Sequence, residues 1–268
     1  MTAAEAEVVA VLSDEELAVL THRPSPVVLP HLDDVPAAHL DAVLLTAYRG
    51  LVARGWVHPP PAAAIEAAAR SAAASSPVAL PVRLAGELDD VLRLRADAAM
   101  VACVQRTTAE GQDHRYCHLG GRTALDELVS PDGLHAFRLI PSGDLLPSLA
   151  AYVLDPGADG APGPEHELDP VAAAGGRAPA ALLERLARAT LVADVVVRRA
   201  GDAGAGPMLG ILSGPDGTHV VESWYGSTRP VVLRSVAPAG VPELLRALLD
   251  TPEGQWSGPH GGAYGSEP

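Results

Sequence analysis

The sequence contains no lysine, and all of its permanently positive side chains are arginines. A chain without lysine has no P-loop lysine for nucleotide phosphates, no Schiff-base lysine for pyridoxal phosphate and no kinase-type lysine. Several large classes of nucleotide- and cofactor-dependent enzymes are therefore excluded.

Cysteine, aromatic residues and long apolar stretches are also scarce. The two cysteines, Cys103 and Cys117, do not make a disulfide framework, which is typical of a protein in a reducing compartment. No stretch approaches the roughly 20 apolar residues of a membrane span, and the sequence does not open on a signal peptide. Aromatic residues make up only 3%, which predicts a core of Leu, Val and Ala. We therefore expect a cytoplasmic protein without membrane insertion.

Positive charge is in deficit, because 33 acidic side chains stand against 19 basic ones and the net charge is −14. Such a balance repels phosphate backbones, and no arginine cluster compensates for it locally. We expect no nucleic-acid binding. The stretch Leu51–Val57 resembles the tail of a winged-helix module, and a winged-helix regulator therefore stays an alternative, although its presumed recognition region has almost no basic side chains.

Hydrophobic periodicity predicts an α+β protein with an N-terminal layer ahead of two similar halves. The N-terminal layer has a strand over Val8–Leu12 and helices over Asp14–Leu20, Asp34–Ala53 and Ala62–Ala74. The first half is predicted to contain helix Leu88–Arg95, strands Ala98–Thr107, His114–Leu119, Thr123–Val129 and Leu134–Ile140, and helix Asp144–Leu154. The second half is predicted to contain helix Ala180–Ala189, strands Leu191–Arg199, Pro207–Leu212, Thr218–Trp224 and Pro230–Val236, and helix Val241–Leu249.

The two halves are predicted to be copies of one unit. Leu88–Arg106 aligns with Ala181–Arg199, and a Pro-x-Gly entry precedes each closing helix. Pro147 and Pro242 are expected at first-turn positions of these helices. Each half also has a Pro-Asp-Gly turn, within 130–133 and 213–217. We expect a quasi-twofold repeat of helix, antiparallel meander and helix, which forms a central antiparallel sheet with helical bundles.

The same patterns divide the chain into segments. Residues 1–85 form an N-terminal strand and helical layer, 86–155 the first repeat, 156–177 a flexible linker rich in Gly, Pro and acidic residues, 178–250 the second repeat, and 251–268 a disordered tail.

The search for reactive groups finds no complete motif. His114, Cys117 and His118 are metal-ligand types, but on a strand Cys117 points to the face opposite the two histidines. The glycine-rich segment 201–206 joins two strands and does not open a helix, which argues against a phosphate loop. We expect no cofactor, no metal and no catalysis. The alternative is a small-molecule enzyme with a site between the two halves, using His114, His118 and Arg138.

Three segments resemble the N-terminus of the EspG family, the cytosolic chaperones of type VII (ESX) secretion. They are Leu12–Leu20, Val28–Leu32 and Ala47–Trp56, and the similarity extends to Val236–Val241 before the last helix. In that family a tryptophan precedes the opening Leu-Ser, whereas this chain has Ala10 and Val11 there. The resemblance implies a non-catalytic chaperone with quasi-twofold halves.

The resemblance also implies a partner and the surfaces that bind it. The partner would be a secreted helical protein or heterodimer of the PE/PPE or WXG type, whose apolar surface is kept soluble before export. Family members use the loop after the second sheet strand and a C-terminal helical bundle. In this sequence the corresponding residues are Thr108, Glu110, Gln112 and His114 for the loop, and Leu182, Leu186, Leu244 and Leu248 for the bundle.

Overall fold

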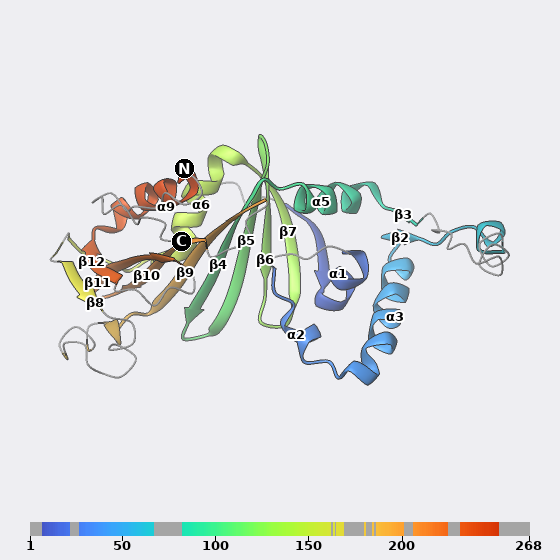
Figure 1. Cartoon of the computed structure of the whole chain (residues 1–268), viewed down its shortest axis with the longest axis horizontal. Coiled ribbons are helices and arrows are strands. Elements are labelled where there is room, and N and C mark those ends of the chain that lie inside the picture. The colour runs from blue at the N-terminus through green and yellow to red at the C-terminus, as the bar shows by residue number, and fades with distance from the viewer. Residues whose placement is uncertain are drawn as a thin grey trace, which may run out of the picture.

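The chain, seen in a computed structural model, folds around a ten-stranded antiparallel sheet with helices on both faces (Figure 1). The α+β class predicted from the sequence is confirmed. The structure describes residues 7–21, 27–66, 82–161, 163, 165–168, 180, 184, 186–200, 206–224 and 231–251.

The first strand and helix form where the N-terminal pattern predicts them. Strand β1 spans Val8–Ser13 and helix α1 spans Asp14–Leu20. The Ser13 hydroxyl accepts a hydrogen bond from the backbone N–H of Glu16, and the Glu16 carboxylate accepts one from the backbone N–H of Ser13. This capping box satisfies N–H groups that helix geometry leaves without partners.

The helix expected over 34–53 starts later in the structure and follows a separate helical turn. Helix α2 spans Pro30–Asp33 and α3 spans Ala37–Ala53, with Pro36 as the N-cap of α3. A proline disfavours helical backbone for the residue before it, which explains the break. A small sheet of β2 (Val57–His58) and β3 (Arg83–Leu84) then leads to α5, which spans Gly86–Ala96. The helix predicted over 62–74 lies largely outside the described residues.

Four strands follow α5 as a meander, and a helix closes the unit. They are β4 (Met100–Thr108), β5 (Gly111–Leu119), β6 (Thr123–Val129), β7 (Leu134–Pro141) and α6 (Ser142–Val153). Strand β1 pairs antiparallel with β7. The N-terminal strand is therefore the outer strand of the first half, and only the helices after it form an added layer.

The second half repeats this order. Its strands and final helix are β9 (Leu191–Arg199), β10 (Pro207–Gly214), β11 (Gly217–Trp224), β12 (Val231–Val236), a 3-10 turn η1 (Pro238–Gly240) and α9 (Val241–Asp250). The helix predicted over 180–189 is described only at 180, 184 and 186–189, of which 180, 184 and 186 are helical, and the tail predicted over 251–268 lies almost wholly outside the described residues.

A segment predicted to be only a linker contributes a strand. Within residues 156–177, β8 (Glu165–Leu168) pairs antiparallel with β12. The backbone N–H of Gly163 also donates to the carbonyl oxygen of Ser235 at 3.2 Å. The linker prediction was wrong for this stretch, because ladder hydrogen bonds at a sheet edge do not require apolar side chains.

The pseudo-twofold axis passes between β4 and β9, the two central strands. The strand order is β1-β7-β6-β5-β4-β9-β10-β11-β12-β8, which reads as two equivalent sets of five. Cys103 pairs with Val196 in the β4–β9 ladder, and the alignment of the two repeats matches the same two residues. In an antiparallel pair a residue faces its own equivalent only at a twofold axis. The predicted quasi-twofold repeat is thereby confirmed.

Two similarities used to predict the repeat do not occupy equivalent positions. The Pro-Asp-Gly turn at 130–133 joins β6 to β7, whereas the turn at 213–217 joins β10 to β11, the equivalents of β5 and β6. Pro147 lies inside α6, whereas Pro242 lies in the first turn of α9. Pro, Asp and Gly are common in turns for local reasons, and their recurrence is weak evidence of duplication.

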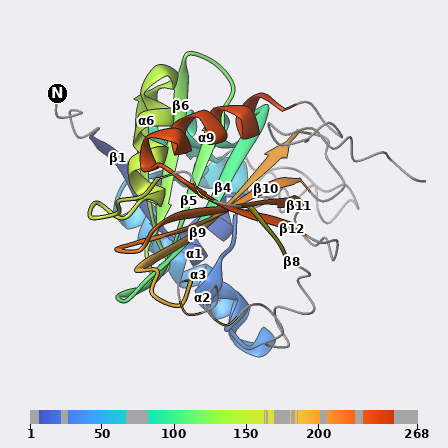
Figure 2. The same cartoon turned by 90° about the vertical axis from the view of Figure 1, so that its left-hand side faces the viewer.

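The helices divide between the two faces of the sheet (Figure 2). On one face α6 and α9 pack together, and their side chains join strand residues of both halves in one core that includes Val104, Leu149, Val195 and Leu245. On the other face α1 and α5 cover the first half, around Phe137 and neighbouring leucines. One face of the sheet is therefore filled by a core that both halves share. On the other face the helices cover only the first half, and the centre of this face is where a site can lie.

Candidate functional site

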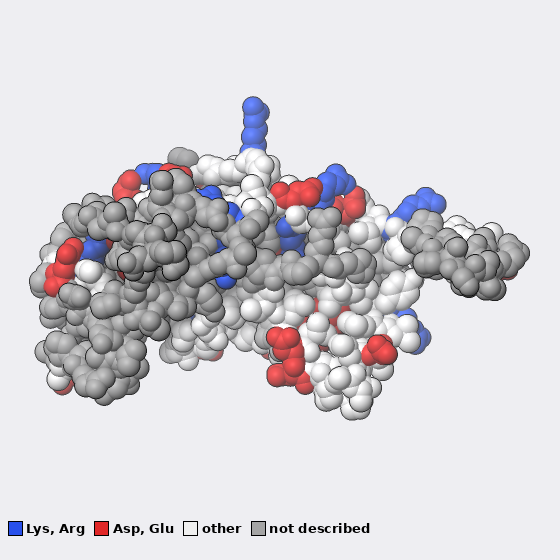
Figure 3. Space-filling view, viewed as in Figure 1, with Lys and Arg blue, Asp and Glu red and all other residues white. Residues whose placement is uncertain are grey.

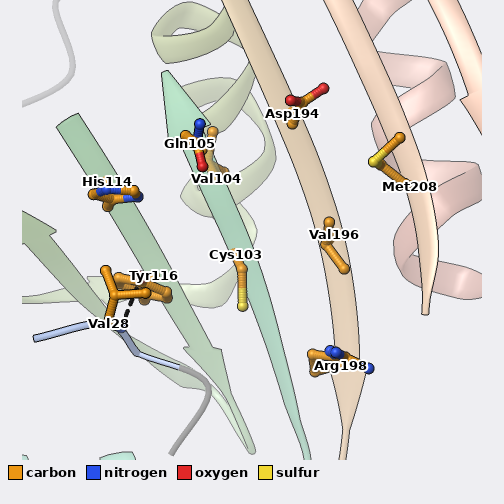
Figure 4. A pocket seen from close by; sticks show the side chains of 10 residues that line it. All are labelled: Val28, Cys103, Val104, Gln105, His114, Tyr116, Asp194, Val196, Arg198 and Met208. Atoms are coloured by element: carbon orange, nitrogen blue, oxygen red, sulfur yellow. Dashed lines mark hydrogen bonds between the residues drawn. The ribbon is translucent and has the colours of Figure 1, made fainter. Parts of the chain in front are cut away.

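A groove crosses the central strands β5, β4, β9 and β10 (Figure 4). Side chains alternate between the faces of a strand. Val104 and Val195 pack under α6 and α9, and the other lining residues of β4 and β9 point to the opposite face. The groove has a volume of about 240 Å³. It is lined by Val28, Cys103, Val104, Gln105, His114, Tyr116, Asp194, Val196, Arg198 and Met208.

Strand register arranges the lining into two parallel rows. His114 of β5 pairs with Gln105 of β4, which pairs with Asp194 of β9, and this row is polar. The next row is mainly apolar and consists of Tyr116, Cys103, Val196 and Met208. Because neighbouring strands lie about 4.8 Å apart, each row presents a side chain at roughly that interval.

The groove carries little charge other than that of Asp194 and Arg198, which lie at its opposite ends (Figure 4). Burial lowers the pKa of His114, which favours the neutral imidazole at neutral pH. Burial likewise raises the pKa of the Cys103 thiol and of the Tyr116 hydroxyl, each to about 12, and both groups stay protonated. A protonated, buried thiol is a poor nucleophile.

One wall of the groove comes from the segment before α2. The backbone N–H of Val28 donates to the Tyr116 hydroxyl at 3.1 Å, and this bond fixes the segment over β5. The Val28 side chain is 41% exposed, whereas Val27 is buried against the sheet. Val28 therefore offers apolar surface at the rim.

The loop residues predicted to bind a partner lie at and beside this groove. Thr108 and Glu110 form the tight β4–β5 turn, where the backbone N–H of Glu110 donates to the Thr108 hydroxyl at 3.2 Å. Gln112 precedes His114 by two residues on β5 and faces the same side of the sheet, and His114 lines the groove itself. Their role in binding stays a prediction, but the structure brings all four into one continuous region.

The β4–β5 hairpin is held firmly by groups on its other face. Arg106 and Asp113 form an ion pair across the hairpin, and the Tyr152 hydroxyl of α6 donates to Asp113 at 2.7 Å. The Arg106 guanidinium lies 4.0 Å from the centre of the Tyr152 ring. The hairpin is thus positioned by α6 before any partner arrives.

Among the leucines that were predicted to form a helical binding surface, those that the structure describes do not line the groove. Leu244 is 7% exposed and Leu248 is fully buried, and both belong to the core between α9 and the sheet. The prediction that they contact a partner was wrong, because the apolar side of an amphipathic helix packs against its own sheet when one is available. Leu186 is partly buried, and Leu182 lies outside the described residues.

The three residues of the alternative enzyme site do not come together. His118 is buried, and its Nε2 lies 2.7 Å from Glu127. Arg138 follows Phe137 on β7, and since Phe137 packs under α1 and α5, Arg138 points to the opposite face from His114 and His118. The structure therefore does not assemble the proposed catalytic group.

A buried ionic network, which no pattern in the sequence predicted, lies beside the groove. Glu127 contacts Arg95 at 3.0 Å, His118 at 2.7 Å and His135 at 2.7 Å, and His135 also contacts Asp14 at 2.7 Å. Burial raises the pKa of Glu127, but the hydrogen bonds from His118 and His135 and the charge of Arg95 outweigh it, and the pKa lies well below its ordinary value. The network joins α1, α5, β5, β6 and β7.

Several groove residues were missed as well. Asp194 interrupts the apolar run of β9 with a polar side chain, and that interruption is the signal from which it could have been found. Gln105 only begins the polar end of β4 and carries no such signal. Met208 and Val196 read as ordinary core residues in the sequence. Only strand pairing shows that they border an open surface.

Comparison with known proteins supports the fold. No protein-family model and no curated protein sequence matches the chain. A solved structure of the Mycobacterium tuberculosis type VII secretion system chaperone EspG5, in complex with a PE25–PPE41 dimer, is similar over 93% of this chain and 99% of that chain, with a TM-score of 0.57 and 13% sequence identity. The fold is that of EspG5. The resemblance found in the sequence is confirmed at the level of fold.

The described residues have three further general features. None of their helices combines the length and apolar character that crossing a membrane requires. No three His, Cys, Asp or Glu side chains among them are gathered as metal ligands. In the view of Figure 3, arginine and acidic side chains intermix and do not gather into one basic surface.

Proposed function

We propose that the chain is a chaperone that captures a secreted helical protein or heterodimer of the PE/PPE or WXG type in the cytoplasm before export. The observation that carries this proposal is the groove across the central strands, together with the hairpin at its end. The same fold occurs in a chaperone solved in complex with a PE25–PPE41 dimer, which makes a helical partner the natural candidate.

The size of the groove suits a protruding helix tip better than a free ligand. Pockets for small molecules usually have volumes of about 300–1,000 Å³ and enclose most of the ligand, whereas this groove has about 240 Å³ and is half open. An amphipathic helix inserts only a few apolar side chains into such a groove, and its remaining surface contacts the rim. The apolar row with Val196 and Met208 would receive those side chains.

Binding of a partner to this surface requires no covalent reaction. Cys103 and Tyr116 stay protonated, and the groove row of His114, Gln105 and Asp194 offers hydrogen-bonding groups that fix orientation. The net charge of −14 keeps a complex with an apolar secretion substrate soluble.

Co-expression tests this proposal directly. The chain is produced together with each helical secretion-type protein or pair encoded near it, purified through a tag on the chain, and the complex mass is measured by light scattering. We expect one partner or pair to co-purify in stoichiometric amount. If every such protein fails to co-purify, the proposal is wrong.

A variant pair then tests the groove. Met208→Glu places a carboxylate in the apolar row and is expected to weaken binding about 30-fold or more, as for a hot-spot residue. Leu45→Glu, on the exposed side of α3 where Leu45 is 58% exposed, is the matched control and should bind as the native chain does. Equal affinity of the two variants would place the interface elsewhere.

A further inference from the structure

Asp194 is the one charged residue in the apolar run 191–197 of β9, and its carboxylate opens into the groove (Figure 4). Burial raises the pKa of Asp194, and no group among the described residues forms an ion pair or hydrogen bond with its side chain. A partly desolvated carboxylate without a partner is costly, so its presence at a surface groove points to a partner that arrives from outside.

The neighbouring strands leave this carboxylate open. Gln105 on one side is uncharged, and Gly210 on the other side has no side chain. A Cβ at Gly210 would lie 3.3 Å from Oδ1 of Asp194, closer than Cβ atoms usually pack, and 3.6 Å from Cβ of Val221, which is an ordinary contact. Since the backbone of Gly210 is not in the left-handed region, a side chain at this position is opposed by its close approach to the Asp194 carboxylate and not by backbone strain.

The nearest cation of the groove is too far away to balance Asp194. Arg198 follows four residues later on the same strand, about 13 Å along it at roughly 3.3 Å per residue, and Figure 4 shows it at the opposite end of the groove. His114 is neutral because burial lowers its pKa. No described cation of the groove therefore supplies a counter-charge for Asp194.

The surface beside Asp194 is apolar and long enough for an alkyl chain. Cys103, Val196 and Met208 form the adjacent row of the floor. A lysine or arginine side chain combines both requirements, because its methylene stem packs on apolar surface while its charged end reaches a carboxylate.

We infer that Asp194 anchors a lysine or arginine side chain of the helical partner, with the alkyl stem lying along Cys103, Val196 and Met208. The inference rests on the proposed function, because this groove is the surface proposed to hold the partner. It adds a chemical requirement on the partner, namely a basic residue at its inserted tip.

Side-chain analogues test the site without knowledge of the partner. Butylguanidinium carries the stem and charge of arginine, and butylurea is its uncharged isostere. Both are titrated into the ¹⁵N-labelled full chain while the backbone amide signals of Asp194, Val196 and Met208 are followed by NMR. We expect butylguanidinium to shift these signals and to bind about tenfold more tightly than butylurea, the gain of a charge-assisted hydrogen bond.

The variant Asp194→Asn keeps the shape of the side chain and removes its charge. It should lower the affinity for butylguanidinium to that for butylurea, whereas Asp41→Asn on the exposed side of α3 should leave the preference unchanged. Thermal melting of both variants shows whether each is folded. Equal binding of the two analogues by the native chain, or an unchanged preference in Asp194→Asn, would overturn the inference.

The two proposals fail in different ways. A groove that prefers butylguanidinium while no helical partner co-purifies would leave the cation site standing and refute the chaperone function. A partner that co-purifies equally with the native chain and with Asp194→Asn would refute the anchoring role and leave the chaperone function standing.

Discussion

Glu127 is a fully buried carboxylate that holds four other elements against its own strand. Its oxygens face Arg95 of α5, His118 of β5 and His135 of β7, and His135 connects it to Asp14 of α1. A buried charge of this kind stabilises only when it is paired, because desolvation is costly for each ion. The helical layer on this face of the first half therefore depends on single side chains as well as on apolar packing.

Glu127→Gln is expected to lower the free energy of unfolding by about 3–5 kcal/mol, since it leaves the buried Arg95 guanidinium without its counter-charge. Denaturant unfolding at neutral pH measures this loss. Glu110→Gln makes the same chemical change at the exposed β4–β5 turn and should change stability by less than about 0.5 kcal/mol. A small loss in Glu127→Gln would show that the network is energetically neutral.

Because the pKa of Glu127 is lowered by folding, we expect the stability of the folded chain to depend on pH. The pKa of Glu127 is lowered in the folded chain, so its stabilising contribution is complete above the unfolded-state pKa of about 4.3 and is lost as the pH falls towards the folded-state value. The difference in unfolding free energy between the native chain and Glu127→Gln should therefore shrink as the pH is lowered from 6 to 3. A difference that stays constant over this range would contradict the assignment.

Among the secondary-structure elements, the outer strand β8 is the clearest case of a strand that forms through backbone pairing with its neighbour and not through the preference of its own residues. Its side chains are not those of a typical strand, yet its backbone pairs with β12 from Val231↔Leu168 to Arg234↔Glu165. It protects one edge of the sheet, where open N–H and C=O groups would otherwise favour association with other strands. The equivalent edge of the first half is formed by β1.

Removing the N–H groups of β8 should expose β12. The double substitution His166→Pro with Glu167→Pro takes away donors that the ladder uses, and we expect the β12 amides that face β8 to exchange with solvent at least about tenfold faster. Hydrogen exchange followed by mass spectrometry measures this. The corresponding double alanine variant keeps both N–H groups and serves as the control, and equal exchange in the two would show that β8 does not pair in solution.

In the whole molecule, the two halves depend on each other. Strands β4 and β9 pair along their full length, from Met100↔Arg199 to Thr108↔Leu191, and α6 and α9 share one core with strands of both halves. The groove exists only because the halves meet, since two of its strands come from each.

We therefore expect residues 1–161 and 162–268 to be unfolded or aggregated when each is produced alone, and to assemble when produced together. Each fragment alone would expose a central strand edge and half of the shared core. Circular dichroism and size-exclusion chromatography of the single and co-expressed fragments measure this. A cooperative thermal transition in either fragment alone would contradict the expectation.

The elements could be predicted from the sequence more completely than the site. The meander strands and α9 follow local periodicity, and their predicted ranges overlap the observed ones. The groove depends on register between distant segments, because Gln105 lies between His114 and Asp194 only when β4 pairs with both β5 and β9. Leu244 and Leu248 show the same limit, since amphipathic spacing predicts an apolar helix face but not what covers it.

What the sequence alone determined is the α+β class, the order of the repeated units and the absence of lysine-dependent chemistry, because these follow from composition and from local patterns. What only the tertiary structure decided is the position of the axis at Cys103 and Val196, the strand at 165–168, the network around Glu127 and the open carboxylate of Asp194. Each of these results from contacts between parts of the chain that are far apart in the sequence, and local preference does not encode such contacts.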